Sequence, residues 1–262
     1  MMGMEIGIIM GYTNKFKVVI LTGNKVRHKY FVKVMKEKFD VIGSIFEPHH
    51  DYFNLQREES SLVRKHFKNL DKYERIYLNP YLSDLNHSDL NHKEIEARHI
   101  NKIENINWVK SLNPDYILLY GTGILNNDWC DEFEDKIINL HLGLSPYYRG
   151  AATLFWPFYN DELDYLGITI HLATSKIDAG DILDTVKPDI DIKDNYYDIT
   201  YKLIKKAIDK FSNIVYRYHS GEQKRIVQDV SKQRYLYKKK DFSEKVLMNV
   251  LSKYGCENVI GS

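Results

Sequence analysis

Short apolar runs alternate along this chain with longer segments in which apolar residues recur at helical spacing. Nearly uninterrupted apolar runs occupy residues 17–22, 40–46 and 115–120, as is typical of strands buried on both faces of a parallel sheet. Later runs predict further strands at 137–141, 166–172 and 182–190. The last two are separated by too few residues for a crossover, so we expect them to be antiparallel neighbours.

Helical periodicity is clearest in two segments of the sequence. Residues 93–112 carry an apolar side chain every three to five positions, and residues 197–218 carry one continuous apolar stripe, so both predict amphipathic helices. Asn113-Pro114 ends the first of them. Shorter helices are predicted over 27–39, over 53–67 (an exposed one), between 125 and 137, and over 151–159.

Alternating strands and helices predict an α/β fold with a mostly parallel, twisted, Rossmann-like sheet and helices on both faces. We expect residues 15–220 to form one domain. Residues 221–262 are a basic, weakly patterned C-terminal extension, in which the three lysines from Lys238 to Lys240 are expected to face solvent.

Composition excludes several classes of function. The 262 residues are 44% hydrophobic and 28% charged, with a net charge of +1, so nothing favours long-range capture of nucleic acid. No apolar run approaches the roughly 18 residues of a membrane helix. The apolar start lacks a basic segment and contains Glu5, so no signal peptide is predicted. Cys130 and Cys256 follow no metal or disulfide spacing, and a reducing cytoplasm is the expected location.

Metal and nicotinamide sites are also not predicted. The spacings of His49, His50, His87 and His92 fit no zinc pattern. The first strand is followed by Gly23-Asn24 rather than by G-x-G-x-x-G. This glycine turn opens a basic helix, and helix N-termini bind anions. Gly23, Asn24 and Arg27 are therefore candidates to hold a phosphate-bearing acceptor, with an ordinary solvated helix as the alternative.

Polar side chains end an otherwise apolar strand at Asn139 and His141. Residues two apart in a strand point the same way, so an amide and an imidazole share one face where open α/β sheets place their active sites. Gly143 and Pro146 turn the chain, and Arg149-Gly150 follows. A second apolar strand ends at His171 and leads to Asp178-Ala179-Gly180.

These two segments together resemble the folate-dependent formyltransferase family. That family carries Asn-x-His, then Pro-x-x-[Arg/Lys]-Gly, then His-x6-Asp-[Ala/Thr]-Gly. The present chain has Asn139-Leu140-His141, Pro146 to Gly150, and His171 followed by Asp178-Ala179-Gly180, in the same order and spacing. The resemblance implies the fold of the formyltransferase N-terminal domain and, as co-substrate, 10-formyltetrahydrofolate.

The family's chemistry needs an oxyanion donor, a base for the attacking amine and a proton for the leaving nitrogen. The resemblance implies that Asn139, His141 and Asp178 are the catalytic set. An amide donates without carrying charge, an imidazole moves protons near neutral pH, and a carboxylate accepts the proton of the amine. His171 lies within its strand and is expected to hold the aspartate loop. Arg149 is expected either to clamp an acceptor phosphate or to pin its loop.

Gly121 and Gly123 allow a ligand to approach the backbone closely. In the family, the matching stretch binds the pterin ring through backbone groups. The resemblance therefore implies cofactor contacts from Thr122, Gly123, Ile124, Leu125, Ser175 and Ile177.

The acceptor is predicted by elimination to be a nucleotide-linked amino sugar. The family's methionyl-tRNA enzymes carry a C-terminal barrel of about a hundred residues, for which the extension is too short, and near-neutral charge argues against tRNA. The purine-pathway enzymes lack the insertion at residues 47–92. Methionyl-tRNA or another small amine, hydrolysis of the folate, and a non-enzymatic folate- or nucleotide-binding protein remain alternatives, and a homodimer is compatible with the sequence.

Overall fold

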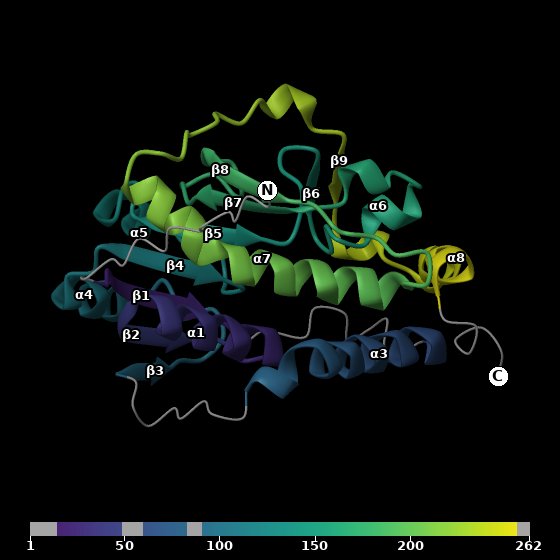
Figure 1. Ribbon diagram of the computed structural model, residues 1–262, viewed down its shortest axis with the longest axis horizontal. Helices are drawn as coiled ribbons and strands as arrows, with labels where there is room; N and C mark the ends of the chain where they lie inside the picture. Colours follow the sequence, from purple (N-terminus) through teal and green to yellow (C-terminus); the bar gives the residue numbers. More distant parts are fainter. Residues whose placement is uncertain (1–14, 49–59, 83–90, 256–262) are drawn as a thin grey trace, which may run out of the picture.

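A computed structural model describes residues 15–48, 60–82 and 91–255 of the chain (Figure 1). Its centre is a seven-stranded sheet in the order β3-β2-β1-β4-β5-β7-β8. These strands are β1 (Lys17–Thr22), β2 (Asp40–Phe46), β3 (His92–Glu94), β4 (Tyr116–Tyr120), β5 (Ile137–His141), β7 (Ile168–Leu172) and β8 (Ile182–Val186). The first five run parallel, whereas β7 is antiparallel to both β5 and β8. The predicted α/β fold and the antiparallel pair are confirmed.

Helices cover both faces of this sheet. One face carries α1 (Val26–Lys38), α3 (Ser61–Leu78) and α7 (Tyr196–His219), and the other carries α4 (Ile103–Leu112) and α5 (Asn127–Glu132). Consecutive strand residues point to opposite faces, so Val18 of β1 joins the core beneath α1 and α7, while Val19 joins the core beneath α4 and α5. In Figure 1, α7 lies across the sheet and α3 runs alongside it.

The predicted helix over residues 93–112 is wrong in its first half. Residues 92–94 form β3, which pairs with β2, and α4 begins only at Ile103. Arg98 adopts a left-handed φ of 69°, which no continuous helix contains. The apolar spacing was misleading because Ile95 and Ile100 face the core from a strand end and a turn instead.

Two shorter predicted helices also differ from the structure. Within the predicted helix over 53–67, residues 53–59 lie outside the described residues. The helix α3 begins after Ser60, whose hydroxyl accepts the N–H of Val63, and continues to Leu78. It is not an exposed helix, because it packs against α1 and α7. The helix predicted over 151–159 shrinks to α6 (Trp156–Tyr159), since Ala152 adopts a left-handed φ of 55°.

The C-terminal extension is folded onto the rest of the molecule. Its strand β9 (Tyr235–Tyr237) pairs with β6 (Tyr148–Gly150), and the ring of Tyr237 stacks on Trp156 at 3.8 Å. Its helix α8 (Glu244–Tyr254) packs against α6 and α3. The three lysines from Lys238 to Lys240 are exposed, as predicted. Single 3-10 turns complete the described chain at Asn79–Tyr81, Leu163–Tyr165, Val230–Lys232 and Lys239–Asp241.

In the part of the chain that the structure describes, no helix is both long enough and apolar enough to cross a membrane.

Candidate active site

The end of β5 brings two of the predicted catalytic residues next to a histidine of the neighbouring strand. Asn139 lies directly opposite His171 in the antiparallel pairing of β5 and β7, so their side chains share one face of the sheet. The Asn139 amide Nδ2 is 3.0 Å from His171 Nε2. Because His171 Nδ1 lies 2.8 Å from the carbonyl oxygen of Leu172, Nδ1 carries the proton, and Nε2 of the neutral ring accepts from Asn139.

Asp178 reaches the same point from the loop that joins β7 to β8. Its carboxylate Oδ1 lies 3.4 Å from His141 Nδ1 and 3.6 Å from His171 Nε2. Asp178 adopts a left-handed φ of 49°, a conformation that Asp tolerates better than most residues. The structure therefore brings Asn139, His141 and Asp178 together, with His171 in contact with two of them.

Burial and charge set the protonation of this group. Burial is the largest influence on His141 and lowers its pKa, although the Asp178 carboxylate opposes the effect. Burial would raise the pKa of Asp178, but the nearby His141, His171 and Arg149 outweigh it and hold that pKa below its usual value. At neutral pH the site thus contains an ionised carboxylate beside a neutral imidazole.

The second nitrogen of His141 is available to a ligand. Among the described residues, buried His141 Nε2 has no hydrogen-bond partner, which is costly unless another group supplies one. A Cβ added at Gly143 would lie 2.6 Å from this nitrogen and 2.7 Å from the hydroxyl of Thr153. A larger residue at position 143 would therefore fill the space next to Nε2.

The loop after β4, predicted to contact the cofactor, is held from beneath by a buried carboxylate. Glu47 accepts the N–H of Gly123 at 2.6 Å and that of Ile100 at 3.1 Å. Within this loop Thr122 is half-buried, Leu125 belongs to the core and Ile124 is 62% exposed. Thus Gly123 uses its N–H internally, while the Ile124 side chain faces solvent.

The other predicted cofactor residues lie on the loop before Asp178. Ser175 and Ile177 are both exposed. The guanidinium of Arg149 donates to the carbonyl oxygen of Ile177 at 2.6 Å and to Oε1 of Gln233 at 3.2 Å. Arg149 thus holds the loop before Asp178, whereas the predicted alternatives were an acceptor phosphate and the loop that carries Arg149 itself.

A carboxylate of the protein occupies the first turn of α1. Glu74 of α3 accepts the backbone N–H of Arg27 at 2.7 Å and its guanidinium at 2.9 Å. The charge and the amide that a phosphate would use at Arg27 are therefore already paired. Gly23 is required by close packing, since a Cβ there would lie 2.4 Å from the ring of His28.

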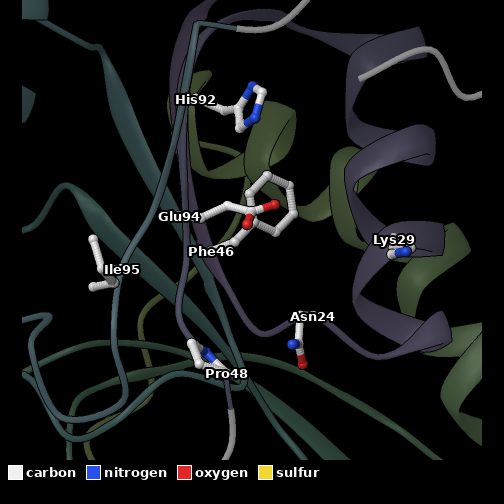
Figure 2. Close-up of a pocket in the computed structure, with 7 residues that line it drawn as sticks. All are labelled: Asn24, Lys29, Phe46, Pro48, His92, Glu94 and Ile95. Atoms are coloured by element: carbon white, nitrogen blue, oxygen red, sulfur yellow. The ribbon is translucent and has the colours of Figure 1, made fainter. Parts of the chain in front are cut away.

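Two cavities are lined in part by residues at the start of α1. One, of about 350 Å³, lies between the start of α1 and the ends of β2 and β3, as Figure 2 shows. Asn24 and Lys29 line it from one side, and Phe46, Pro48, His92, Glu94 and Ile95 line it from the other. A second, of about 260 Å³, is mostly apolar and includes Arg27, Thr153 and Leu142, the residue after His141. Asn139, His141 and Asp178 line neither cavity.

A comparison with protein families identifies the family of this chain. A family model described as Formyl transferase matches residues 72–215, which is more than half of the 262-residue chain. The chain belongs to the formyl transferase family. The resemblance found in the sequence motifs is thereby confirmed, and the matched segment contains all three predicted catalytic residues.

Curated relatives resemble this chain over part of their length. The methionyl-tRNA formyltransferase of Clostridium acetobutylicum is 37% identical over 122 residues, which is 43% of this chain and 38% of that protein. The chain covers about 40% or less of the first curated relatives that it matches.

Solved structures share its fold. WlaRD, a sugar 3N-formyl transferase solved in the presence of dTDP and 5-N-formyl-THF, has a TM-score of 0.57 at 20% identity, covering 94% of this chain and 81% of its own. Phosphoribosylglycinamide formyltransferase from Anaplasma phagocytophilum has a TM-score of 0.56 at 15% identity, covering 79% and 89%.

Sequence reasoning did not find three residues that hold the loops and helices around the site. Glu47, Glu74 and Gln228 are buried polar residues whose partners are distant in sequence. The only local signal is that Glu47 directly follows an apolar strand, which is a position typical of site residues in α/β folds. No cluster of metal-ligating side chains occurs within residues 15–48, 60–82 and 91–255.

Proposed function

We propose that this formyl transferase moves the formyl group of 10-formyltetrahydrofolate to a primary amine at Asn139, His141 and Asp178. The observation that carries the proposal is the convergence of these side chains at the end of β5, in a chain that belongs to the family. The partnerless Nε2 of His141 fits such a substrate pair, because a buried imidazole nitrogen gains a partner only when a ligand arrives.

Asn139 is proposed to stabilise the oxygen of the formyl group. When the amine attacks the formyl carbon, the carbonyl electrons move to oxygen, and a positioned N–H donor there contributes about 3–4 kcal/mol. The contact with His171 orients the Asn139 amide before the substrates bind. An amide suits this role because it donates without a charge that would have to be desolvated.

His141 and Asp178 are proposed to move one proton. The attacking amine loses a proton and the folate nitrogen gains one as its bond to the formyl carbon breaks. His141 Nε2 takes the first proton, and the ionised Asp178 at Nδ1 stabilises the resulting imidazolium. The imidazolium then protonates the leaving nitrogen, so the site returns to its starting state.

As acceptor we propose a nucleotide-linked amino sugar. The likeness to WlaRD covers 94% of this chain, a share that cannot be reached without part of residues 221–262. The likeness to phosphoribosylglycinamide formyltransferase, the purine-pathway enzyme, covers only 79% of this chain. The cavity beside Asn24 is lined by both polar and aromatic side chains (Figure 2), and Asn24 and Lys29 face it. These two suit an acceptor phosphate better than Arg27, which is paired with Glu74.

Methionyl-tRNA is the second candidate acceptor. The 37% identity with the Clostridium acetobutylicum enzyme favours it. That identity covers the part of the chain that the two activities would share, and so it supports formyl transfer more strongly than it supports either acceptor.

The test follows release of tetrahydrofolate from 10-formyltetrahydrofolate in parallel reactions. The acceptors are UDP- and dTDP-linked amino sugars, methionyl-tRNA, or water alone. We expect release that depends on one nucleotide-linked sugar, with a formyl group on its amine by mass spectrometry. Release with methionyl-tRNA would move the proposal to the second candidate, and release in water alone would indicate a hydrolase.

A substitution at Asp178 tests whether the activity depends on the candidate site. Asp178→Asn keeps the shape of the side chain and removes the carboxylate, so we expect kcat to fall by about 10²- to 10⁴-fold. Asp184→Asn, on the neighbouring strand β8, serves as the control and should keep wild-type kcat. An active Asp178→Asn enzyme would remove Asp178 from the mechanism.

A further inference from the structure

The loop that carries Asp178 is held by a side chain from the C-terminal extension. Gln228 is buried, and its amide Nε2 donates to the carbonyl oxygen of Asp178 at 3.0 Å and to that of Gly180 at 2.6 Å. One NH₂ group therefore bridges two carbonyls of the loop. Neither the sequence motifs nor the proposed transfer of the formyl group uses Gln228.

The backbone held in this way is the part of the loop that aims the carboxylate. Asp178 adopts a left-handed φ of 49°, which neighbouring contacts must stabilise in a residue other than glycine. Its carboxylate contacts His141 and His171 at 3.4 and 3.6 Å. A small rotation of the Asp178 backbone would break both contacts. A clamp on the Asp178 carbonyl thus acts directly on the position of the carboxylate.

Gln228 is itself anchored by the chain that precedes it. Ile226 exchanges two backbone hydrogen bonds with Ile182 at the start of β8, at 2.8 and 2.9 Å. Arg225 forms ion pairs with Asp135 at 2.7 Å and with Asp181 at 2.9 Å. These contacts fix residues 225 and 226, and thereby the position from which the Gln228 side chain reaches the loop.

We propose that Gln228 is a positioning residue that holds Asp178 in its catalytic orientation. The catalytic part of this proposal depends on the proposed formyl transfer. The clamp on the loop depends only on the two hydrogen bonds from Gln228. The proposal makes residues 225–228 of the extension part of the support of the active site.

The test replaces Gln228 with Met, which keeps its length and removes both donors. Gln223→Met is the matched control: Gln223 lies in the same extension, and its side-chain amide also donates to a backbone carbonyl, that of Leu183 on β8. We expect Gln228→Met to lower kcat by about 10- to 100-fold, the usual effect of a misplaced catalytic group, with KM for the folate unchanged. Gln223→Met should keep wild-type kcat.

A second measurement needs no activity. In Gln228→Met the carboxylate should move away from His141, His171 and Arg149, the neighbours that lower the pKa of Asp178. NMR of carboxyl-labelled aspartate should therefore show that pKa rising towards that of free aspartate, and Gln223→Met should leave it unchanged. A folded Gln228→Met protein with wild-type kcat and an unchanged Asp178 pKa would overturn the proposal. If no acceptor supports transfer even in the wild type, the pKa alone decides whether the clamp exists.

Discussion

At the scale of single residues, the site depends on keeping a histidine neutral inside the protein. Burial lowers the pKa of His141 more than Asp178 raises it. A neutral ring can take up a proton at Nε2, whereas a ring already charged could not. The same burial links the site to the stability of the fold, because the unfolded chain binds a proton at His141 at a higher pH than the folded chain does.

We therefore predict that stability falls with acid in a way that depends on His141. Below the unfolded pKa of about 6.5, the unfolded state gains a proton that the folded state does not, so the free energy of unfolding declines until the lowered folded pKa is reached. His141→Gln should reduce this slope between pH 7 and the folded pKa, as measured by urea unfolding at a series of pH values. An identical slope in both proteins would show that His141 is not kept neutral by the fold.

At the scale of elements, local pattern predicts well where the core dictates it. The strands β1 and β2 and the helix α7 lie where the periodicity places them, to within a residue. Pattern fails over residues 93–102, where the same apolar spacing serves a strand end and turns. The local pattern also cannot predict buried polar contacts, because Glu47, Glu74 and Gln228 each form hydrogen bonds with partners more than 45 residues away. The motif residues could be predicted because their spacing is local, whereas the residues that hold them could not.

The link between α3 and α1 leads to a prediction at this scale. Arg27 and Glu74 form an ion pair in which their side chains are only 18% and 3% exposed. Removing one partner leaves a buried charge uncompensated, so Glu74→Gln should destabilise the fold by about 3–5 kcal/mol. Arg27→Met with Glu74→Leu should recover part of that loss, as measured by denaturant unfolding. If Arg27 instead binds an acceptor phosphate, Arg27→Met should raise the acceptor's KM without a comparable loss of stability.

At the scale of the whole molecule, the extension and the sheet share one hydrophobic core. Phe242, Leu247, Val250 and Leu251 are buried in the same core as the strands and α7, and each contributes about 1.5–3 kcal/mol by leaving water. Together these four side chains are worth roughly as much as the 5–15 kcal/mol by which a typical domain is stable.

A chain that ends at residue 220 would also lose β9 and Gln228. We therefore predict that residues 1–220 alone will not show a cooperative thermal transition by circular dichroism. A chain ending at residue 255 keeps all these contacts and should melt like the full chain. A folded, active 1–220 fragment would contradict both this argument and the placement of Gln228 in the site, because formyl transfer would then proceed without the clamp on Asp178.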